Sequence, residues 1–374
     1  MQNSSWIIIA ILAGLAPVSG EQYLYLASKT NKLVSYTINT ESGALKPHSA
    51  FELPGAGGPM AMSADHKFLY IESHFKIGDA KRPSPHIVTL KHEAGQFTQT
   101  LVAPVHLRSP GIFVDATGKN LLGAHYGEGK VSVWKIDDSR ACTGKLTDEH
   151  TTAANAHFVT TDPSGRFVYV PHTAPNAVYQ FSLDPDKGLL TPLDPPFVSG
   201  PEEGHDYHQP RHYAHHPTLK MGYTSNERGG GISSWKFDSK TGALTLHQTL
   251  SSLPPDWKGG SAAADIHITP NGKFVYISNR DTRKLEEGAK PGDTIAGFSI
   301  NQDTGALTPI GHFPTEYFPR AFRIDTTGRF LYVAGQKSNK LAAYRINQDT
   351  GALERVGTYE TGEAPIWVIC WSQS

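Results

Sequence analysis

Cysteine and long apolar segments are both scarce in this sequence. Only two cysteines, Cys142 and Cys370, occur among 374 residues. An exported protein would permit a disulfide, but we expect both to be unpaired thiols. The formal net charge of −1 excludes a large basic field, so neither nucleic acid nor a membrane surface is expected as a partner. Beyond the N-terminus, no segment is long and apolar enough to cross a bilayer.

The N-terminus has the features of an export signal. Residues 6–16 form an apolar run of eleven residues, which is too short to span a membrane. Val18 and Gly20 are small residues suited to the positions before a cleavage site, so we place cleavage after Gly20. The segment before the run lacks Lys and Arg, and the alternative is a buried N-terminal strand. We predict a signal peptide over residues 1–20, a secreted protein, and a single domain over residues 21–374.

A short sequence motif recurs along the rest of the chain. In its clearest copy, residues 264–280, Ile266 and Ile268 alternate with polar residues as in a strand, and a Pro-Asn-Gly turn follows at 270–272. Residues 274–277 are aromatic or β-branched, as a second strand prefers. Other copies occupy 162–170 and 325–333, and weaker ones begin at Ser63, Asp115 and His216. The equivalent positions, spaced 45–56 residues apart, are Tyr25, Tyr70, Leu122, Tyr169, Tyr223, Tyr276 and Tyr332.

A glycine-containing turn repeats independently with a similar spacing. Thr-Gly-Ala-Leu begins at 241, 304 and 350, and looser versions complete the set of turn glycines: Gly43, Gly95, Gly144, Gly188, Gly242, Gly305 and Gly351. These two sequence motifs alternate along the chain, and each is present seven times, which indicates a repeat architecture. About 50 residues with four strands is the size of a propeller blade. The sequence therefore predicts an all-β fold, a seven-bladed β-propeller with four-stranded antiparallel blades.

The two ends of the chain each hold part of one blade. Tyr23–Ala27 resembles the second strand of a blade without its inner strand, and Pro365–Trp371 is an inner strand with no partner after it. We expect these strands to pair in one blade, which would close the ring and remove free sheet edges. The repeat is interrupted at Pro195–Gln209 and at Asp281–Asp293, where we predict loops.

The repeat also places chemistry at one mouth of the central channel. The first two strands of a blade are antiparallel, so the start of the first and the end of the second lie at the same mouth. The starts carry Gly58, Pro110, His157, Arg211, Ala264 and Arg320, and the ends carry His74, Tyr126, Thr173, Glu227, Arg280 and Gln336. Arginines can bind carboxylate or phosphate bidentately, and His or Glu can transfer protons, so the set suits an anionic substrate.

From these positions we predict two groups of site residues. The catalytic candidates are His157, Glu227, Arg211 and Arg280, and the substrate-binding candidates are Arg320, His74, Tyr126 and Gln336. The alternative is structural, because Glu227 could pair with Arg211 or Arg280 only to join neighbouring blades.

Other polar clusters give weaker signals. A His-rich stretch that could bind a metal contains His205, Asp206, His208, His212, His215 and His216. Strand alternation puts His212 and His215 on opposite faces, and no metal spacing is kept, so we expect no metal and no cofactor. Asp265 and His267 share a face of one strand and are interpreted as satisfied buried polar groups.

At these residues the chain resembles the seven-bladed lactonase family. That family includes the bacterial propeller-type 6-phosphogluconolactonases and the fungal 3-carboxy-cis,cis-muconate lactonizing enzymes. The resemblance covers nearly all of the chain after residue 20 and is most specific at 263–270, 319–320 and 334–338. The family's proposed site, a His, an Arg, a Glu and a second Arg, matches His157, Arg211, Glu227 and Arg280. The bacterial enzymes are cytoplasmic, whereas we predict that this chain is secreted, and the insertion after Arg280 looks more like the fungal branch.

The resemblance implies lactone chemistry more firmly than a particular substrate. We predict a monomeric, metal-independent lactonase for a small anionic lactone of the sugar-acid, 6-phosphogluconolactone-like type. Arg211 and Arg280 would bind the anionic group and the developing oxyanion, while His157 or Glu227 acts as the base on water. A muconate-type lactonizing enzyme, a cycloisomerase, is the enzymatic alternative. A propeller that binds a ligand or partner without catalysis is the other, since fold alone does not fix function.

Overall fold

The computed structural model describes residues 21–93, 95–201 and 208–372, so the predicted signal peptide lies outside the described residues. Every regular element within these ranges is a β-strand. The strands are β1 (Gln22–Ser28), β2 (Lys32–Ile38), β3 (Leu45–Glu52), β4 (Ala56–Met62), β5 (Phe68–Phe75), β6 (Ser84–Glu93), β7 (Gln96–Pro104), β8 (Gly111–Val114), β9 (Asn120–His125), β10 (Lys130–Ile136), β11 (Cys142–Thr151), β12 (Thr160–Thr161), β13 (Phe167–His172), β14 (Ala177–Asp184), β15 (Leu189–Ser199), β16 (His208–His215), β17 (Met221–Arg228), β18 (Gly231–Phe237), β19 (Leu244–Ser251), β20 (Ser261–Ile268), β21 (Phe274–Asp281), β22 (Thr294–Ile300), β23 (Leu307–Pro314), β24 (Pro319–Ile324), β25 (Phe330–Gly335), β26 (Lys340–Ile346), β27 (Leu353–Glu360) and β28 (Pro365–Ser372).

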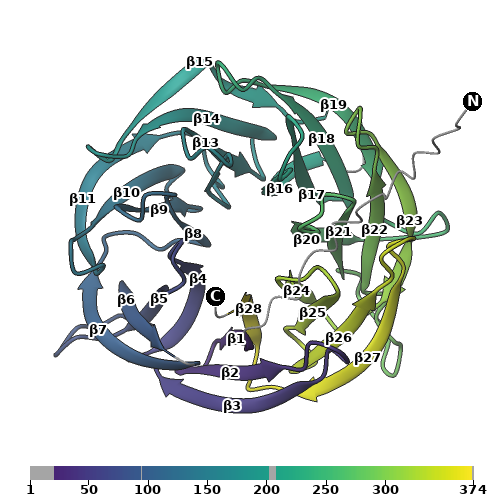
Figure 1. Cartoon of the computed structure of the whole chain (residues 1–374), viewed down its shortest axis with the longest axis horizontal. Coiled ribbons are helices and arrows are strands. Elements are labelled where there is room, and N and C mark those ends of the chain that lie inside the picture. The colour runs from purple at the N-terminus through teal and green to yellow at the C-terminus, as the bar shows by residue number, and fades with distance from the viewer. Residues whose placement is uncertain (1–20, 94, 202–207, 373–374) are drawn as a thin grey trace, which may run out of the picture.

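These strands form seven antiparallel blades around one axis, with the first strand of each blade innermost (Figure 1). Six blades are the consecutive sets β4–β7, β8–β11, β12–β15, β16–β19, β20–β23 and β24–β27. The seventh consists of β28 followed by β1–β3. A bridge between Arg228 and Ala262 joins the β16–β19 and β20–β23 blades into one sheet. The predicted all-β, seven-bladed propeller is confirmed.

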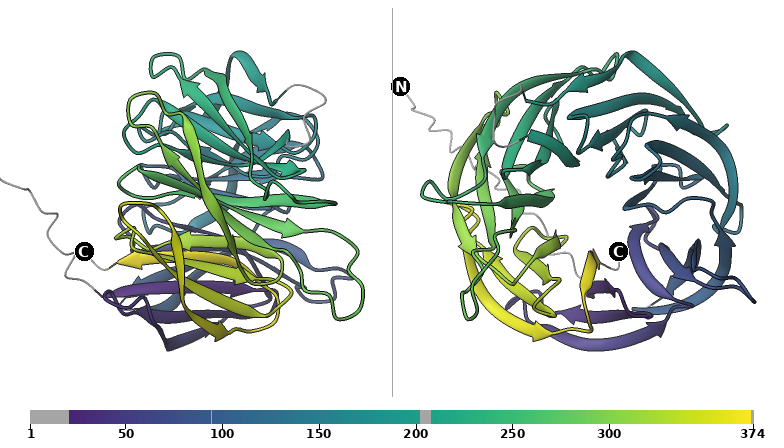
Figure 2. Two further views of the ribbon diagram at one scale, coloured as in Figure 1. Left: turned by 90° about the vertical axis from the view of Figure 1, so that its right-hand side faces the viewer. Right: turned by 180° about the vertical axis from the view of Figure 1, so that it is seen from behind.

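Strands from the two ends of the chain pair with each other, as the incomplete first copy predicted. In the shared blade, Leu24 lies opposite Cys370 and Leu26 opposite Val368 (Figure 1). Every side chain of β1 is buried. The views from the side and from behind also place β1 and β28 together in the ring (Figure 2). The inner edge of β1 is therefore covered by β28 rather than left open.

In four places the two repeated sequence motifs contact each other between neighbouring blades. The buried Tyr332 hydroxyl donates to the carbonyl oxygen of Gly43 at 3.0 Å, and Tyr276 donates to Gly351 at 2.8 Å. Tyr169 and Tyr223 make the same bond to Gly242 and Gly305 in the next blade. Gly43 has a φ of 77°, and a Cβ there would lie 2.3 Å from the Phe330 ring. The glycines therefore allow both the turn and the close approach of the next blade.

One predicted loop, Pro195–Gln209, is wrong at both ends, and its residues 202–207 lie outside the described residues. His208 and Gln209 belong to the inner strand β16. Pro195–Ser199 was expected in a connection, but it belongs to the outer strand β15, where Phe197 pairs with Tyr179. Prolines are tolerated there because an outer edge strand does not need every N–H for its ladder. The second predicted loop is confirmed: it leaves β21 at Asp281 and enters β22 at Thr294.

Two further expectations concern cysteines and membranes. Cys142 and Cys370 are both buried and unpaired, as predicted. Within the residues that the structure describes, no helix is long and apolar enough to cross a bilayer.

Candidate active site

Two arginines reach the channel from β-bulges at the start of inner strands. In β16 the register shifts between Pro210 and His212, which leaves Arg211 as an extra residue against β17. A similar shift at the start of β24 makes Arg320 an extra residue, again directly after a proline. A bulge bends its strand and re-aims a side chain, and proline fits because it has no N–H to contribute. In both Pro-Arg dipeptides, the proline therefore fits the bulge and the arginine is the residue that the bulge redirects.

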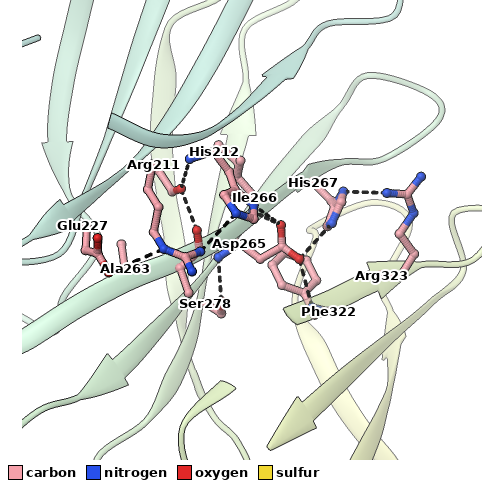
Figure 3. A network of polar contacts seen from close by, with 12 residues as sticks. Arg211, His212, Glu227, Ala263, Asp265, Ile266, His267, Ser278, Phe322 and Arg323 are labelled. Carbon is pink, nitrogen blue, oxygen red and sulfur yellow. Dashed lines mark hydrogen bonds and ion pairs between the residues drawn. The ribbon is translucent and has the colours of Figure 1, made fainter. Parts of the chain in front are cut away.

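Glu227 and Arg280, near the ends of β17 and β21, form an ion pair between two blades. Arg280 Nη2 lies 2.5 Å from Glu227 Oε1, and it also donates to the carbonyl oxygen of Ala263 at 3.2 Å. Arg211 Nε lies 3.5 Å from the same Glu227 oxygen (Figure 3). The structure therefore brings these three predicted residues together. It also contains the interblade ion pairs of the structural alternative, so pairing alone does not decide the function.

His157 lies beside this group, just before β12. Its ring centroid is 5.7 Å from that of Tyr126 and 5.2 Å from that of His212. The residue is 5% exposed, and its Nδ1 has no hydrogen-bond partner among the described residues. A buried polar atom without a partner is unusual in a folded protein. In this cluster it is an atom that a substrate or a water molecule could engage.

This cluster has three positive charges and one negative charge. The guanidinium groups of Arg211, Arg280 and Arg320 all lower the pKa of the Glu227 carboxyl group. Burial lowers the pKa of Arg211, and the charges of Arg280 and Arg320 lower it further. Burial raises the pKa of Glu227, but Arg211 and Arg280 outweigh that effect and hold it below its ordinary value. Burial, followed by the charge of Arg211, holds the pKa of His157 well below its ordinary value. At neutral pH the site therefore contains a carboxylate and a neutral imidazole.

Two of the predicted substrate-binding residues join this cluster. Burial, followed by the charge of Arg280, lowers the pKa of Arg320 to about 10, and Tyr126 is close enough to affect it too. Tyr126 also packs edge-on against His157. His74 instead bonds Glu72 of its own strand, with Nε2 2.6 Å from Oε1.

The other predicted position, Gln336, donates its backbone N–H to Phe318 at 3.0 Å. In the described ranges, the side chains of His74 and Gln336 make no hydrogen bond or ion pair with the four catalytic candidates. Their assignment to substrate binding stays a prediction.

Two residues outside the predicted set belong to the same group. His212 Nε2 lies 3.2 Å from Arg211 Nη1, and the Phe318 ring centroid lies 5.3 Å from the guanidinium carbon of Arg280. The sequence could have indicated both residues only through their neighbours: His212 directly follows Arg211, and Phe318 directly precedes a Pro-Arg pair.

The His-rich stretch divides between two faces of β16, as alternation predicted. The His212 ring stacks on Phe158 at 4.5 Å, whereas the His215 ring packs edge-on against Phe237 at 4.6 Å. His205 and Asp206 lie outside the described residues. Among the residues that are described, no group of three or more His, Cys, Asp or Glu is arranged to hold a metal ion.

A layer of side chains lies between this cluster and a second space in the channel. Phe158, His212, Asp265 and Trp367 line a cavity of about 620 Å³ that extends to the turns at the opposite mouth. None of the four catalytic candidates lines that cavity. The charged cluster and the cavity therefore adjoin at His212, which contacts Arg211 and also lines the cavity.

This arrangement is suited to binding an anion beside a neutral imidazole. A bound anion would offset the mutual repulsion of the guanidinium groups, each of which can donate two parallel hydrogen bonds. Glu227 has 24% of its side chain exposed, so the ion-paired centre is reachable from solvent.

Comparison with known proteins agrees with the fold and gives its family. Residues 23–370 match the family model described as "Lactonase, 7-bladed beta-propeller". The chain is 33% identical to the 6-phosphogluconolactonase of Serratia proteamaculans, over 93% of this chain and 98% of that protein. Among solved structures, it resembles a putative 6-phosphogluconolactonase from Bacteroides fragilis, with a TM-score of 0.80, 21% identity, and coverage of 96% of this chain and 100% of the other. The periplasmic gluconolactonase of Pseudomonas aeruginosa has a TM-score of 0.81 at 17% identity, with 94% and 99% covered.

Proposed function

The chain belongs to the lactonase family of seven-bladed β-propellers, and on that premise we propose that it hydrolyses a small anionic lactone of the sugar-acid type. The observation that carries the proposal is one buried imidazole with an unpartnered Nδ1 beside three guanidinium groups and one carboxylate. A propeller that served only as a scaffold would have no need for this excess of buried positive charge.

The arginines account for substrate binding and for charge stabilisation. Arg280 is held by Glu227 and by backbone carbonyl oxygens, so its remaining N–H groups have a fixed direction. Arg211 and Arg320 bring two more charges from neighbouring blades. Together they can bind the anionic group of the substrate and the oxyanion that develops on the lactone carbonyl. Fixed donors of this kind typically contribute about 3–4 kcal/mol to the transition state.

His157 is the better candidate for the base, because Glu227 is already engaged by two guanidinium groups. The neutral imidazole takes a proton from water while the water oxygen bonds to the carbonyl carbon. The bond from that carbon to the ring oxygen then breaks, and the ring oxygen receives the proton from His157, giving an open-chain hydroxy acid. A bound anion offsets the arginine charges that lower the pKa of His157, so the base becomes stronger when substrate is present.

The identity of the lactone follows from the relatives only as a class. The curated relatives are named 6-phosphogluconolactonases, and we propose a lactone of that chemical type with an anionic group. We also propose that the protein is exported, because of the apolar run at residues 6–16.

The direct test is hydrolysis of a panel of lactones followed by pH-stat titration. The panel contains δ-gluconolactone, 6-phosphogluconolactone and an aromatic lactone, together with 3-carboxy-cis,cis-muconate to test the lactonizing alternative. We expect acceleration of an anionic sugar lactone and competitive inhibition by its product acid. Binding of the product acid without acceleration of any substrate would establish the non-catalytic alternative instead.

A further inference from the structure

A buried aspartate joins three successive blades next to the candidate site. Asp265, 7% exposed, accepts through Oδ1 from His212 Nδ1 at 2.9 Å and from the backbone N–H of Ile266 at 3.0 Å. Its Oδ2 accepts from the backbone N–H of Phe322 at 3.1 Å and lies 3.2 Å from His267 Nε2. Both oxygens are therefore fully engaged. His267 in turn contacts Arg323 near the other end of the chain of polar contacts in Figure 3.

The contacts of Asp265 determine where His212 carries its proton. A carboxylate can only accept, so the Nδ1 of His212 must be the donor. A neutral imidazole then has its lone pair on Nε2, and that atom lies 3.2 Å from Nη1 of Arg211, which can only donate. Burial and the charge of Arg211 lower the pKa of His212 to about 4, so the ring is neutral at pH 7. At each contact along Asp265, His212 and Arg211, one donor therefore meets one acceptor.

The same contacts determine the direction of the Arg211 side chain. This guanidinium is 1% exposed and extends from a bulge residue, so backbone pairing does not restrain it. His212 holds Nη1, and Glu227 lies 3.5 Å from Nε. With the other tautomer, His212 would present an N–H to an N–H, and Arg211 would have to turn away.

We propose that Asp265 is a positioning residue for the anion site: it fixes the tautomer of His212 and thereby aims Arg211 at the substrate. This inference rests on the proposed function for its catalytic meaning, but its physical content is the orientation of Arg211. Carboxylates that orient metal-ligating imidazoles from behind typically change affinity or activity tenfold to a hundredfold when removed, and we expect an effect of that order here.

The test uses substitutions that separate positioning from stability. Asp265→Asn removes the charge that fixes the tautomer. His212→Leu removes both contacts, whereas His212→Gln retains one donor and one acceptor. Asp325→Asn is the matched control, because Asp325 is also buried and accepts from backbone N–H groups, three in number, but at a turn and without contact to His212.

The primary measurement is the affinity of the folded, full-length protein for inorganic phosphate, by calorimetry, with kcat and KM measured on the active lactone. We expect Asp265→Asn and His212→Leu to weaken phosphate binding about tenfold or more. His212→Gln should restore most of the affinity, and Asp325→Asn should leave it unchanged. Nitrogen-15 spectra of the histidines, assigned with His212→Gln, should show Nδ1 protonated and Nε2 unprotonated in the wild type, and a changed tautomer in Asp265→Asn.

Several outcomes would overturn the proposal. One is unaltered phosphate affinity in folded Asp265→Asn and His212→Leu, which would make Asp265 a clamp between blades and nothing more. Another is a wild-type His212 protonated at Nε2. If Asp265→Asn does not fold, the two His212 variants decide, because they leave the bonds from Asp265 to Ile266 and Phe322 intact. Weakened phosphate binding in a protein that hydrolyses no lactone would refute the proposed function but not the positioning role.

Discussion

Replacing Glu227 by Gln should make the protein less stable and, at the same time, more responsive to anions. Glu227 is the carboxylate that three guanidinium groups share, and the substitution keeps its shape and one acceptor oxygen. Arg211, Arg280 and Arg320 are then left to repel one another without a neutralising partner. A bound anion can supply the missing negative charge, so it should stabilise the variant more than the wild type.

The size of the effect follows from the geometry of the ion pairs. Breaking a buried ion pair by removing one partner costs about 3–5 kcal/mol. Glu227 has 24% of its side chain exposed and the amide still accepts from Arg280, so we expect a loss of roughly 2–3 kcal/mol in the free energy of unfolding, below that range. Phosphate at 100 times its Kd returns about 2.7 kcal/mol by binding only the folded state. The wild type binds phosphate as well, so the difference narrows by the ratio of the two Kd values, about 1.4 kcal/mol if the variant binds tenfold more tightly.

The assay is denaturant unfolding with and without phosphate, with NaCl added to match ionic strength. Glu149→Gln is the matched control. Glu149 also pairs with two basic side chains, Lys130 at 2.5 Å and His106 at 2.6 Å, and has 19% of its side chain exposed, but it lies in β11 outside the cluster. This variant should lose stability without any additional response to phosphate. Equal phosphate stabilisation of the wild type and both variants would refute the claim that the cluster is an anion site.

Three further predictions concern the fold, its pH dependence and export. Deleting residues 364–374 removes β28 and exposes the buried inner edge of β1, so the protein should fail to fold; an unchanged Tm in the truncated chain would contradict the closed ring. Burial lowers the pKa of five histidines in the folded protein to about 4, below the ordinary value of 6.5: His92, His125, His172, His212 and His215. The unfolded chain therefore binds protons first as the pH falls, so stability should be constant above pH 6.5 and decrease from pH 6.5 towards 4. Thermal melts at a series of pH values would show this. N-terminal sequencing of the secreted protein should begin at Glu21, and an intact Met1 on exported protein would remove the signal-peptide prediction.

Much of the fold could be predicted because each repeat carries a residue with an obligatory role. Turn glycines such as Gly43 need a positive φ, and the repeated tyrosines need a partner for a buried hydroxyl. The structure joins these two requirements in one contact between blades, as Tyr332 and Gly43 show. The spacing of the motifs therefore indicated the number of blades, and the incomplete copies at the two ends of the chain indicated the closure of the ring.

The site was predictable only to the level of ring positions. Fixed offsets placed His157, Arg211, Glu227 and Arg280 at one mouth, but they assume a uniform strand, and Arg211 lies on a bulge whose effect depends on the neighbouring blade. The contact of Arg211 with His212, the next residue in the chain, results from that local bend.

Contacts between residues far apart in the sequence also determine which polar residues bond within their own blade and which join neighbouring blades. The His74 ring bonds Glu72 of its own strand, and Glu72 also accepts from the backbone of Ser109 in the next blade. Asp265 was interpreted as a satisfied buried group, and its contacts show that its partners come from three blades. Such pairings depend on the packing between blades and leave no periodic signal in the sequence.

The central claim, catalysis by an imidazole set among arginines, is tested most directly by kcat/KM for an anionic sugar lactone in His157→Ala and Arg166→Ala. Arg166 is exposed and bonds the carbonyl oxygen of Ser239 at a turn at the opposite mouth. We expect His157→Ala to lower kcat, and with it kcat/KM, by about 10²–10⁴-fold with an unchanged Tm, because a positioned general base contributes that much, while Arg166→Ala keeps nearly full activity. Full activity in His157→Ala, or loss of activity only through unfolding, would contradict the account.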